Sequence, residues 1–361
     1  DYTGNDVTGE NFYAVLSGNR SALSGGSGKV VDSGPNDTIF IYYSDHGTTG
    51  LLGMPAGESV WYFTFADVLK KKYAAKSYNK MVIYLEACES GSMFDGILPE
   101  NISIYATTAS NVTEKSYAFY CPYLDPPPPP EYTTCLGDTF SISWLEDSDR
   151  NDMTKETLQQ QYEIVRQRTL TGNIDTASHV MQYGDRKFNN DFLATFIGAK
   201  PTSVNDKYNP TSSANAYSFE PSTPQTRLIS QRDAHLLHLR LELQKAPDGS
   251  KEKLKAQKKL DDEIAHREHV DNVVHLVGDI LFGEEKSSTM MLHVRPAGQP
   301  LVDDWNCFKT LIKTYESHCG TLSSYGRKYT RAFANMCNAG ISKERMVVAS
   351  SQACSKDNHA S

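Results

Sequence analysis

Two short apolar runs, each followed at once by small and polar residues, restrict what this chain can fold into. Residues 37–43 (DTIFIYY) and 80–86 (KMVIYLE) have the composition of buried strands, and residues 101–107 (NISIYAT) resemble them. Helical patterns lie between and after these strands, at residues 60–76 and 154–170. The alternation predicts an α/β fold, with a mostly parallel sheet flanked by helices.

The character of the chain changes near residue 201. Residues 201–226 are rich in Ser, Thr, Asn and Pro and have almost no apolar periodicity, which predicts an exposed linker. Beyond it, apolar residues from Leu236 to Leu281 recur at helical spacing and form a stripe typical of a helical core. We therefore expect an α/β core over residues 1–200 and a helical C-terminal module over residues 227–361.

Composition and charge restrict the partners. The chain has 361 residues and a net charge of −8, which argues against nucleic acid. No apolar run approaches the length of a membrane span, so we expect no membrane partner. Residues 1–200 carry 15 basic and 25 acidic side chains, whereas residues 201–361 carry 21 and 19. The two halves should attract each other near neutral pH, and protonation of carboxylates should weaken that attraction.

Seven cysteines leave one over if the others pair. Four lie near the C-terminal end and two flank a proline-rich stretch, which leaves Cys88. Six paired cysteines and one free thiol suit an oxidising compartment. Four N-glycosylation sequons agree with passage through the secretory pathway, and they begin at Asn19, Asn36, Asn101 and Asn111. Four late cysteines allow three pairings, and their spacing alone does not choose among them.

A thiol and an imidazole follow the first two strands. His46 comes directly before Gly47, and Cys88 lies two residues beyond the second strand. Because parallel strands present their carboxyl ends at one edge of a sheet, the two side chains should face each other. Such a pair suits nucleophilic thiol catalysis, with the backbone amides of Gly47 and Cys88 holding an oxyanion. The alternatives are a half-buried cysteine that caps a strand and a turn histidine that bonds its neighbours.

Several longer motifs resemble the legumain family of asparaginyl endopeptidases, called vacuolar processing enzymes in plants. The motifs are YYSDHG, EACESGSMF, YATTASN, EYTTCLGD, SHVMQYGD, QRDA and RPAGQPLVDDW. The resemblance runs from Asp1 to roughly Cys354, and the proline-rich loop is similar to that of the plant branch. It implies a caspase-like α/β core followed by a helical, inhibitory prodomain. The linker would be the segment that is cut on activation.

The resemblance also implies roles for individual residues. Cys88 matches the nucleophile and His46 its general base and acid. A second group matches the substrate-binding pocket, and it comprises Glu86, Asp138, Ser116, Tyr117 and Ala118. The implied reaction is cleavage of peptides and proteins after accessible Asn, and more slowly after Asp at acid pH, with no metal or cofactor. For Glu86 and Asp138, simple surface charge is the alternative.

The resemblance also implies that the C-terminal module inhibits the core of its own chain. The segment Gln231, Arg232 and Asp233 would lie nearest the pocket, with Gln231 as a plug, and acid would loosen it. The family pattern implies three disulfides, namely Cys121–Cys135, Cys307–Cys337 and Cys319–Cys354. It further implies a place in the secretory pathway, in a lytic or protein-storage vacuole or outside the cell.

Two departures from the family leave alternatives open. The family core begins before the equivalent of Asp1, with two strands and a helix that carry an arginine and an asparagine of the site. A truncated, non-catalytic relative whose module serves in binding or structure is therefore the alternative. Ala118 and Thr48-Thr49 also differ from the usual hydrolase residues. Peptide ligation, in which an amine intercepts the thioester instead of water, is thus a second outcome of the same chemistry.

Overall fold

The computed structural model describes residues 1–170, 177–199 and 228–355. The linker expected over residues 201–226 lies outside these ranges. A central sheet has the strand order β1-β5-β6-β9. Its strands are β1 (Thr38–Ser44), β5 (Lys80–Glu86), β6 (Ile104–Thr108) and β9 (Met181–Gly184). The first three are parallel and β9 is antiparallel, so the mostly parallel sheet is confirmed.

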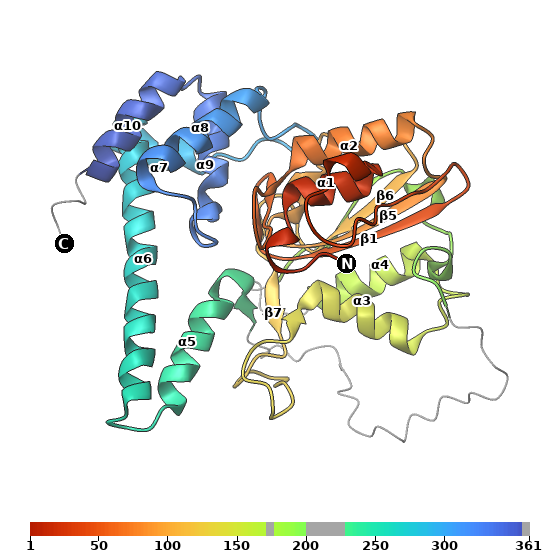
Figure 1. Cartoon of the computed structure of the whole chain (residues 1–361), viewed down its shortest axis with the longest axis horizontal. Coiled ribbons are helices and arrows are strands. Elements are labelled where there is room, and N and C mark those ends of the chain that lie inside the picture. Colours follow the sequence, from red (N-terminus) through yellow and green to blue (C-terminus); the bar gives the residue numbers. More distant parts are fainter. Residues whose placement is uncertain (171–176, 200–227, 356–361) are drawn as a thin grey trace.

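Helices cover both faces of this sheet (Figure 1). One face carries α1 (Gly9–Ser17) and α2 (Tyr62–Ala74), and the other carries α3 (Thr139–Arg150) and α4 (Leu158–Thr169). The layers follow from the pleat of the strands, because alternate side chains of a strand point to opposite faces. Met81, Ile83 and Leu85 of β5 pack with the residues of α1 and α2, whereas Val82 and Tyr84 pack with those of α3 and α4.

Two expected helices begin later than their apolar patterns suggest. The pattern at residues 60–76 opens with strand β4 (Val60–Trp61) before α2 begins. The helix expected over residues 154–170 begins at Leu158. There, Thr157 accepts from the backbone of Gln160, whose side chain bonds back to the backbone of Thr157. This capping box fixes the start of α4.

Two small antiparallel sheets lie beside the central one. The first has the order β2-β3-β4 and the second the order β10-β7-β8. Their remaining members are β2 (Gly47–Thr48), β3 (Leu51–Leu52), β7 (Tyr117–Phe119), β8 (Gly137–Asp138) and β10 (Ile229–Ser230). Short 3-10 helices complete the described chain, and they are η1 (Gly4–Asp6), η2 (Arg20–Ala22), η3 (Ser90–Met93), η4 (Arg186–Phe188), η5 (Leu193–Thr195), η6 (Gln231–Asp233) and η7 (Gly326–Tyr329).

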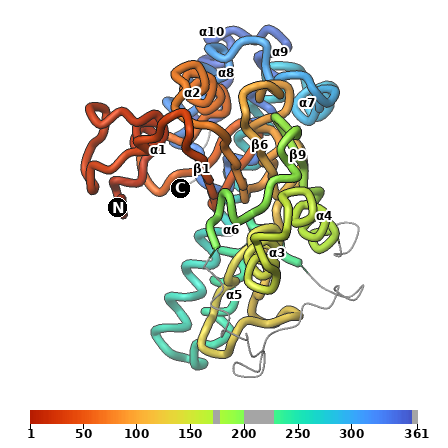
Figure 2. The backbone as a smooth tube through the Cα atoms, turned by 90° about the vertical axis from the view of Figure 1, so that its right-hand side faces the viewer, coloured from red at the N-terminus to blue at the C-terminus, as the bar shows by residue number. Residues whose placement is uncertain are grey.

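The C-terminal module is helical (Figures 1 and 2). It contains α5 (Ala234–Lys245), α6 (Lys251–Phe282), α7 (Glu284–Met291), α8 (Trp305–Cys319), α9 (Thr330–Asn338) and α10 (Lys343–Ser355). The valines of the predicted stripe on α6, among them Val273, Val274 and Val277, pack with α8, α9 and α10. Within the described ranges, none of the helices has the length and apolar character needed to cross a membrane.

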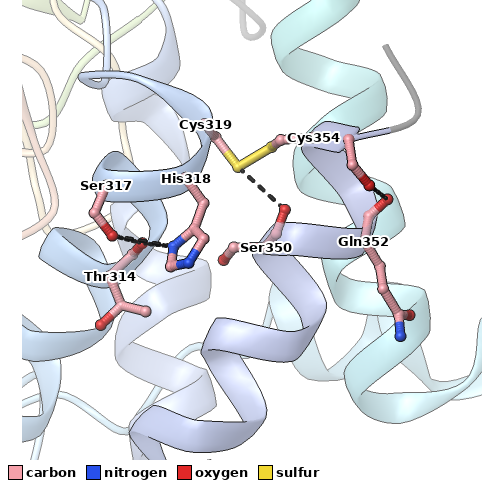
Figure 3. The surroundings of a disulfide bond; sticks show 8 residues. Thr314, Ser317, His318, Cys319, Ser350, Gln352 and Cys354 are labelled. Carbon is pink, nitrogen blue, oxygen red and sulfur yellow. Dashed lines mark hydrogen bonds between the residues drawn. A yellow bond between two sulfur atoms is a disulfide. The ribbon is translucent and has the colours of Figure 1, made fainter. Parts of the chain in front are cut away.

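Three disulfides join the cysteine pairs that the resemblance implied. Cys121–Cys135 closes the proline-rich loop of the core, and Cys307–Cys337 joins α8 to α9. Cys319–Cys354 joins the end of α8 to α10, where the Cys319 sulfur lies 3.6 Å from the carbonyl oxygen of Ser350 (Figure 3). Cys88 is the single free cysteine of the seven, and it is buried.

Candidate active site

The ends of β1 and β5 bring His46 and Cys88 to the same edge of the central sheet. Ser44 pairs with Glu86 in the parallel register, so the two chains leave the sheet together. The carbonyl oxygen of His46 accepts from the backbone of Gly53 at 2.7 Å, and its own N–H donates to Asp45 at 2.5 Å. These bonds fix the backbone on both sides of the imidazole.

Gly47 allows the two strand ends to approach closely. A Cβ atom at this position would lie 2.5 Å from the Cβ of Ala87 and 3.0 Å from the carbonyl oxygen of Cys88. The first distance is too short for any side chain larger than hydrogen, and the second is a tight contact. A glycine is therefore required where the loop of His46 passes the loop of Cys88.

The thiol of Cys88 is fully buried. Its sulfur accepts from the backbone N–H of Ser116 at 3.4 Å and lies 3.7 Å from the Ser116 hydroxyl. Burial raises the pKa of Cys88, although the charge of Arg232 and the bonds from Ser116 oppose that shift. Cys88 is therefore not half-buried, as the strand-capping interpretation assumed, and its burial favours the neutral thiol.

The thiol and the imidazole converge on one atom, the side-chain oxygen of Gln231. This oxygen lies 3.0 Å from Nδ1 of His46 and 3.7 Å from the sulfur of Cys88. It comes from a segment 143 residues away from Cys88 along the chain. An amide carbonyl thus occupies the space between the two groups.

Two buried carboxyls lie beside this pair. The hydroxyl of Ser116 donates to Asp138 at 3.0 Å, and Ser141 donates to one oxygen of Glu86 from its backbone (2.7 Å) and its hydroxyl (2.9 Å). The other oxygen of Glu86, Oε1, has no hydrogen-bond partner among the described residues. Glu86 is 0% and Asp138 9% exposed, so the interpretation of both as surface charge is wrong.

Burial governs the protonation of both carboxyls. It raises the pKa of Asp138 to about 6, although the bond from Ser116 opposes the shift. It also raises the pKa of Glu86 well above its usual value, and the neighbouring charge of Asp138 adds to the effect. The pair therefore favours at least one bound proton when it has no cationic or amide partner.

A strand from the module side extends the sheet that carries Tyr117 and Ala118. Strand β10 pairs antiparallel with β7, with Ile229 opposite Ala118 and Ser230 opposite Tyr117. The backbone N–H of Gln231 then donates to the carbonyl oxygen of Ser116 at 3.0 Å. The segment thus adds an edge strand to β7, which is a common way to bind an extended peptide.

Arg232 and Asp233, which follow Gln231, bind different parts of the chain. Arg232 donates to Glu89 at 3.0 Å and to the carbonyl oxygen of Gly47 at 3.3 Å, so it lies within the site. Asp233 instead accepts from Arg267 of α6 at 2.8 Å. Of the three residues expected nearest the pocket, Asp233 therefore binds α6 of the module instead of a residue of the core.

Several residues of the site were not anticipated. They are Glu89, Ser141 and Arg267, whereas Thr48 and Thr49, which the sequence marked as departures from the usual hydrolase residues, both contact Glu89. Two of them carry a sequence signal, because Glu89 follows Cys88 directly and Arg267 interrupts the apolar stripe of α6 between Leu260 and Val270. A charged residue within such a stripe is buried only if it has a partner. Ser141 carries no comparable signal.

Comparisons with known proteins agree with this architecture. Residues 1–199 match the model of the Peptidase C13 family, and residues 258–354 match that of the legumain prodomain. A vacuolar-processing enzyme of Vicia sativa is 52% identical over 354 residues, which cover 98% of this chain and 71% of the relative. One of Citrus sinensis is 54% identical, over 98% of this chain and 70% of the relative. A legumain of Canavalia ensiformis is 47% identical, over 98% and 73%. The chain therefore belongs to the peptidase C13 family of cysteine peptidases, as its motifs implied, and it carries a legumain prodomain.

Proposed function

We propose that this chain is part of the inactive precursor of an endopeptidase that cleaves peptide bonds after Asn, and more slowly after Asp at acid pH. One observation carries the proposal: the side-chain oxygen of Gln231 contacts both His46 and Cys88. The side-chain amide of Gln231 lies between the thiol and the imidazole, and a scissile peptide group would also have to lie between them. The site is thus arranged for a carbonyl between a thiol and an imidazole.

The reaction follows from these groups. The imidazole of His46 takes the proton of Cys88, and the thiolate attacks the carbonyl carbon. Backbone amides of Gly47 and Cys88 hold the negative oxygen of the tetrahedral intermediate. Its collapse breaks the C–N bond, and the imidazolium gives its proton to the leaving amine. Water then hydrolyses the thioester and regenerates the thiol.

The selectivity is assigned to Glu86, Asp138 and Ser116. A substrate Asn amide offers two N–H donors, and the free oxygen of Glu86 and the carboxyl of Asp138 are acceptors. These acceptors favour such an amide over an apolar side chain, because the apolar one would leave them unpaired in a buried pocket. The carboxyl of a protonated Asp has one donor, which accounts for slower cleavage that is confined to acid pH.

The module is the inhibitor in this proposal. Its segment at β10 follows β7 as a substrate would, and Arg232 closes the site through Glu89. Glu58 of the core also meets Lys309 and Lys313 of α8, at 3.4 and 3.1 Å. Acid removes the negative charges that hold the two parts together, and a cut in the linker makes release permanent. The names of the relatives support a vacuolar site of action.

The test uses the precursor that contains this chain, before and after acidification. Hydrolysis of an Ala-Ala-Asn reporter should appear only after acid treatment and should be absent from Cys88→Ala. Matched reporters that end in Gln and Asp should be cleaved far more slowly. An acid-treated precursor that cleaves none of them would favour the non-catalytic alternative. A peptide amine added to the same reaction measures ligation, since it diverts the thioester from water.

A further inference from the structure

Thr48 lies at the point where the core, the candidate active site and the module meet. Its side chain is buried on strand β2. Its hydroxyl oxygen lies 2.7 Å from the carbonyl oxygen of Arg327, 2.9 Å from the hydroxyl of Thr330 and 3.2 Å from Oε2 of Glu89. The first two groups belong to the module, and the third belongs to the residue that follows Cys88. The side chain of Thr48 therefore contacts both the core and the module.

The neighbours of Thr48 outnumber its protons. A hydroxyl has one proton to donate, and a carbonyl or ionised carboxylate can only accept. Thr330 can donate to Thr48, which leaves Arg327 and Glu89 in competition for the single Thr48 proton. The Arg327 oxygen is closer by 0.5 Å (2.7 against 3.2 Å), so it is the favoured acceptor while the module is docked.

Glu89 has other donors in the docked state. Thr49 donates to its Oε2 at 2.6 Å, and Arg232 donates to its Oε1 at 3.0 Å. Arg232 leaves together with the module, because it follows β10 and its carbonyl oxygen is held by Arg267 of α6. Departure of the module thus removes one donor from Glu89 and, at the same moment, frees the proton of Thr48.

We propose that Thr48 is a positioning residue that exchanges its acceptor when the module leaves. It donates to Arg327 in the capped precursor and to Glu89 in the open enzyme. The exchange fastens the module through Thr330 and Arg327, and afterwards it keeps Glu89 in place beside Cys88. This inference rests on the proposed function, since it assigns a regulatory contact to the same site.

The first test measures docking without requiring catalysis. The rate at which iodoacetamide alkylates Cys88 in the intact precursor at neutral pH reports how often the module lifts. Thr48→Val keeps the shape of the side chain and removes its hydroxyl. The Arg327 carbonyl and the Thr330 hydroxyl then lose their partner at the buried interface between core and module. We expect alkylation to become roughly ten- to a hundredfold faster. Thr330→Val should act in the same direction.

Matched variants separate the hydroxyl from general damage to the fold. Thr48→Ser retains the hydroxyl and should stay close to the wild-type rate, even though it removes a methyl group. Thr169→Val removes another buried hydroxyl, one that bonds within α4 on the far side of the core from the module, and it should leave the rate unchanged. On a free-energy scale, the effect of the double variant Thr48→Val with Thr330→Val should be smaller than the sum of the two single effects, because both substitutions remove the same contact.

A second readout uses the activated enzyme. There, Thr48→Val should lower kcat more than it raises KM, because Glu89 keeps only the donor Thr49, and Thr48→Ser should restore kcat. The inference is overturned if Cys88 is alkylated at the wild-type rate in the Thr48→Val precursor. It is also overturned if Cys88 is alkylated as fast in the Thr48→Ser precursor as in Thr48→Val. Wild-type Cys88 that reacts equally fast before and after activation overturns the proposed function instead, since the module would then not cover the site.

Discussion

Arg232 and Glu89 form a buried ion pair, with 3.0 Å between their charged groups and 9% of each side chain exposed. Glu89 follows Cys88, and Arg232 follows Gln231, so the pair joins the nucleophile to the segment that covers it. A buried pair of this kind adds little stability over an apolar replacement, but loss of one partner leaves the other as an uncompensated buried charge. The contact therefore makes docking sensitive to either residue.

Replacing Arg232 by Met should open the precursor. The uncompensated Glu89 should weaken docking by about 3 to 5 kcal/mol, which corresponds to a gain in Cys88 labelling of about two to three and a half orders of magnitude at neutral pH. Arg20→Met is the matched control, because Arg20 forms an exposed pair with Asp32 whose loss should have no effect. Equal labelling of the two variants would show that the pair does not hold the segment.

Asp138→Asn should change both selectivity and pH dependence. The folded protein binds the proton of Asp138 more tightly than the unfolded chain, since its pKa rises from 3.8 to about 6. Its ionisation therefore destabilises the core increasingly as pH rises across this window, by about 3 kcal/mol in full. The variant should flatten the stability curve between these pH values, in denaturant titrations. It should also lose turnover of an Asn reporter by orders of magnitude.

Asp149→Asn provides the control for that experiment. Asp149 lies on α3, the helix that begins directly after Asp138, and it is exposed. Its replacement should alter neither the stability curve nor the turnover. An Asp138→Asn enzyme that cleaves the Asn reporter normally would place the pocket elsewhere.

Glu58 should contribute to the acid sensitivity of docking. Burial by itself raises the pKa of Glu58, but the hydrogen bond from Lys313 and the charges of both Lys309 and Lys313 lower it overall. A lowered pKa means that the contact stabilises docking above the ordinary carboxyl pKa and loses that effect as pH falls through the folded value. Glu58→Gln should therefore shift the midpoint of acid activation to higher pH.

The shift at Glu58 should be modest, because its side chain is 41% exposed and solvent screens the pair. Asp67→Asn is the control, since Asp67 is an exposed carboxylate whose ion pair, with Lys71, lies within α2. A midpoint that is the same in the wild type and in Glu58→Gln would exclude this contact as part of the acid response.

Glu156→Gln should stabilise the core at neutral pH. Both carboxyl oxygens of Glu156 are buried, and the side chains of Asp147 and Asn151 interact with them. Burial and the nearby Asp147 raise the pKa of Glu156 to about 8. Stability is therefore lost as pH rises from the ordinary carboxyl pKa towards that value. A Gln amide can instead donate to Asp147, which should raise the free energy of unfolding by about 1 to 3 kcal/mol near pH 8 and by much less at acid pH.

Denaturant titrations at acid and at slightly alkaline pH check this prediction. Glu163→Gln, on the exposed face of α4, serves as the control and should change neither curve. A uniform gain of Glu156→Gln at both pH values would show that the proton of Glu156 is not responsible.

The meeting of His46 and Cys88 could be predicted because it depends on local signals and one general rule. Apolar runs mark β1 and β5, and parallel strands end at a common edge. The segment that covers this site, β10 with Gln231, could be predicted only from the resemblance to a known family. Strands β7 and β10 have three and two residues, too few to show a period, and they lie more than a hundred residues apart. Nothing local in the sequence marks such a pairing.

The contacts of Glu89 escaped prediction for a related reason. They join three distant parts of the chain, namely Thr48-Thr49, Glu89 and Arg232. Each residue alone is an ordinary polar residue of a loop or strand end. Their burial is a property of the docked module and not of any local pattern. The same holds for Asp233, whose partner on α6 is visible only once the helix is placed.

The three disulfides lie within the core or within the module, and none joins the one to the other. Before the linker is cut, the module is tethered beside the site at an effective concentration that no free inhibitor reaches in solution. After the cut, the same surfaces meet as two separate molecules, and their association depends on dilution. A crowded storage compartment and a dilute extract would then show different activities from identical amounts of cut enzyme, because only the extract lets the fragments drift apart.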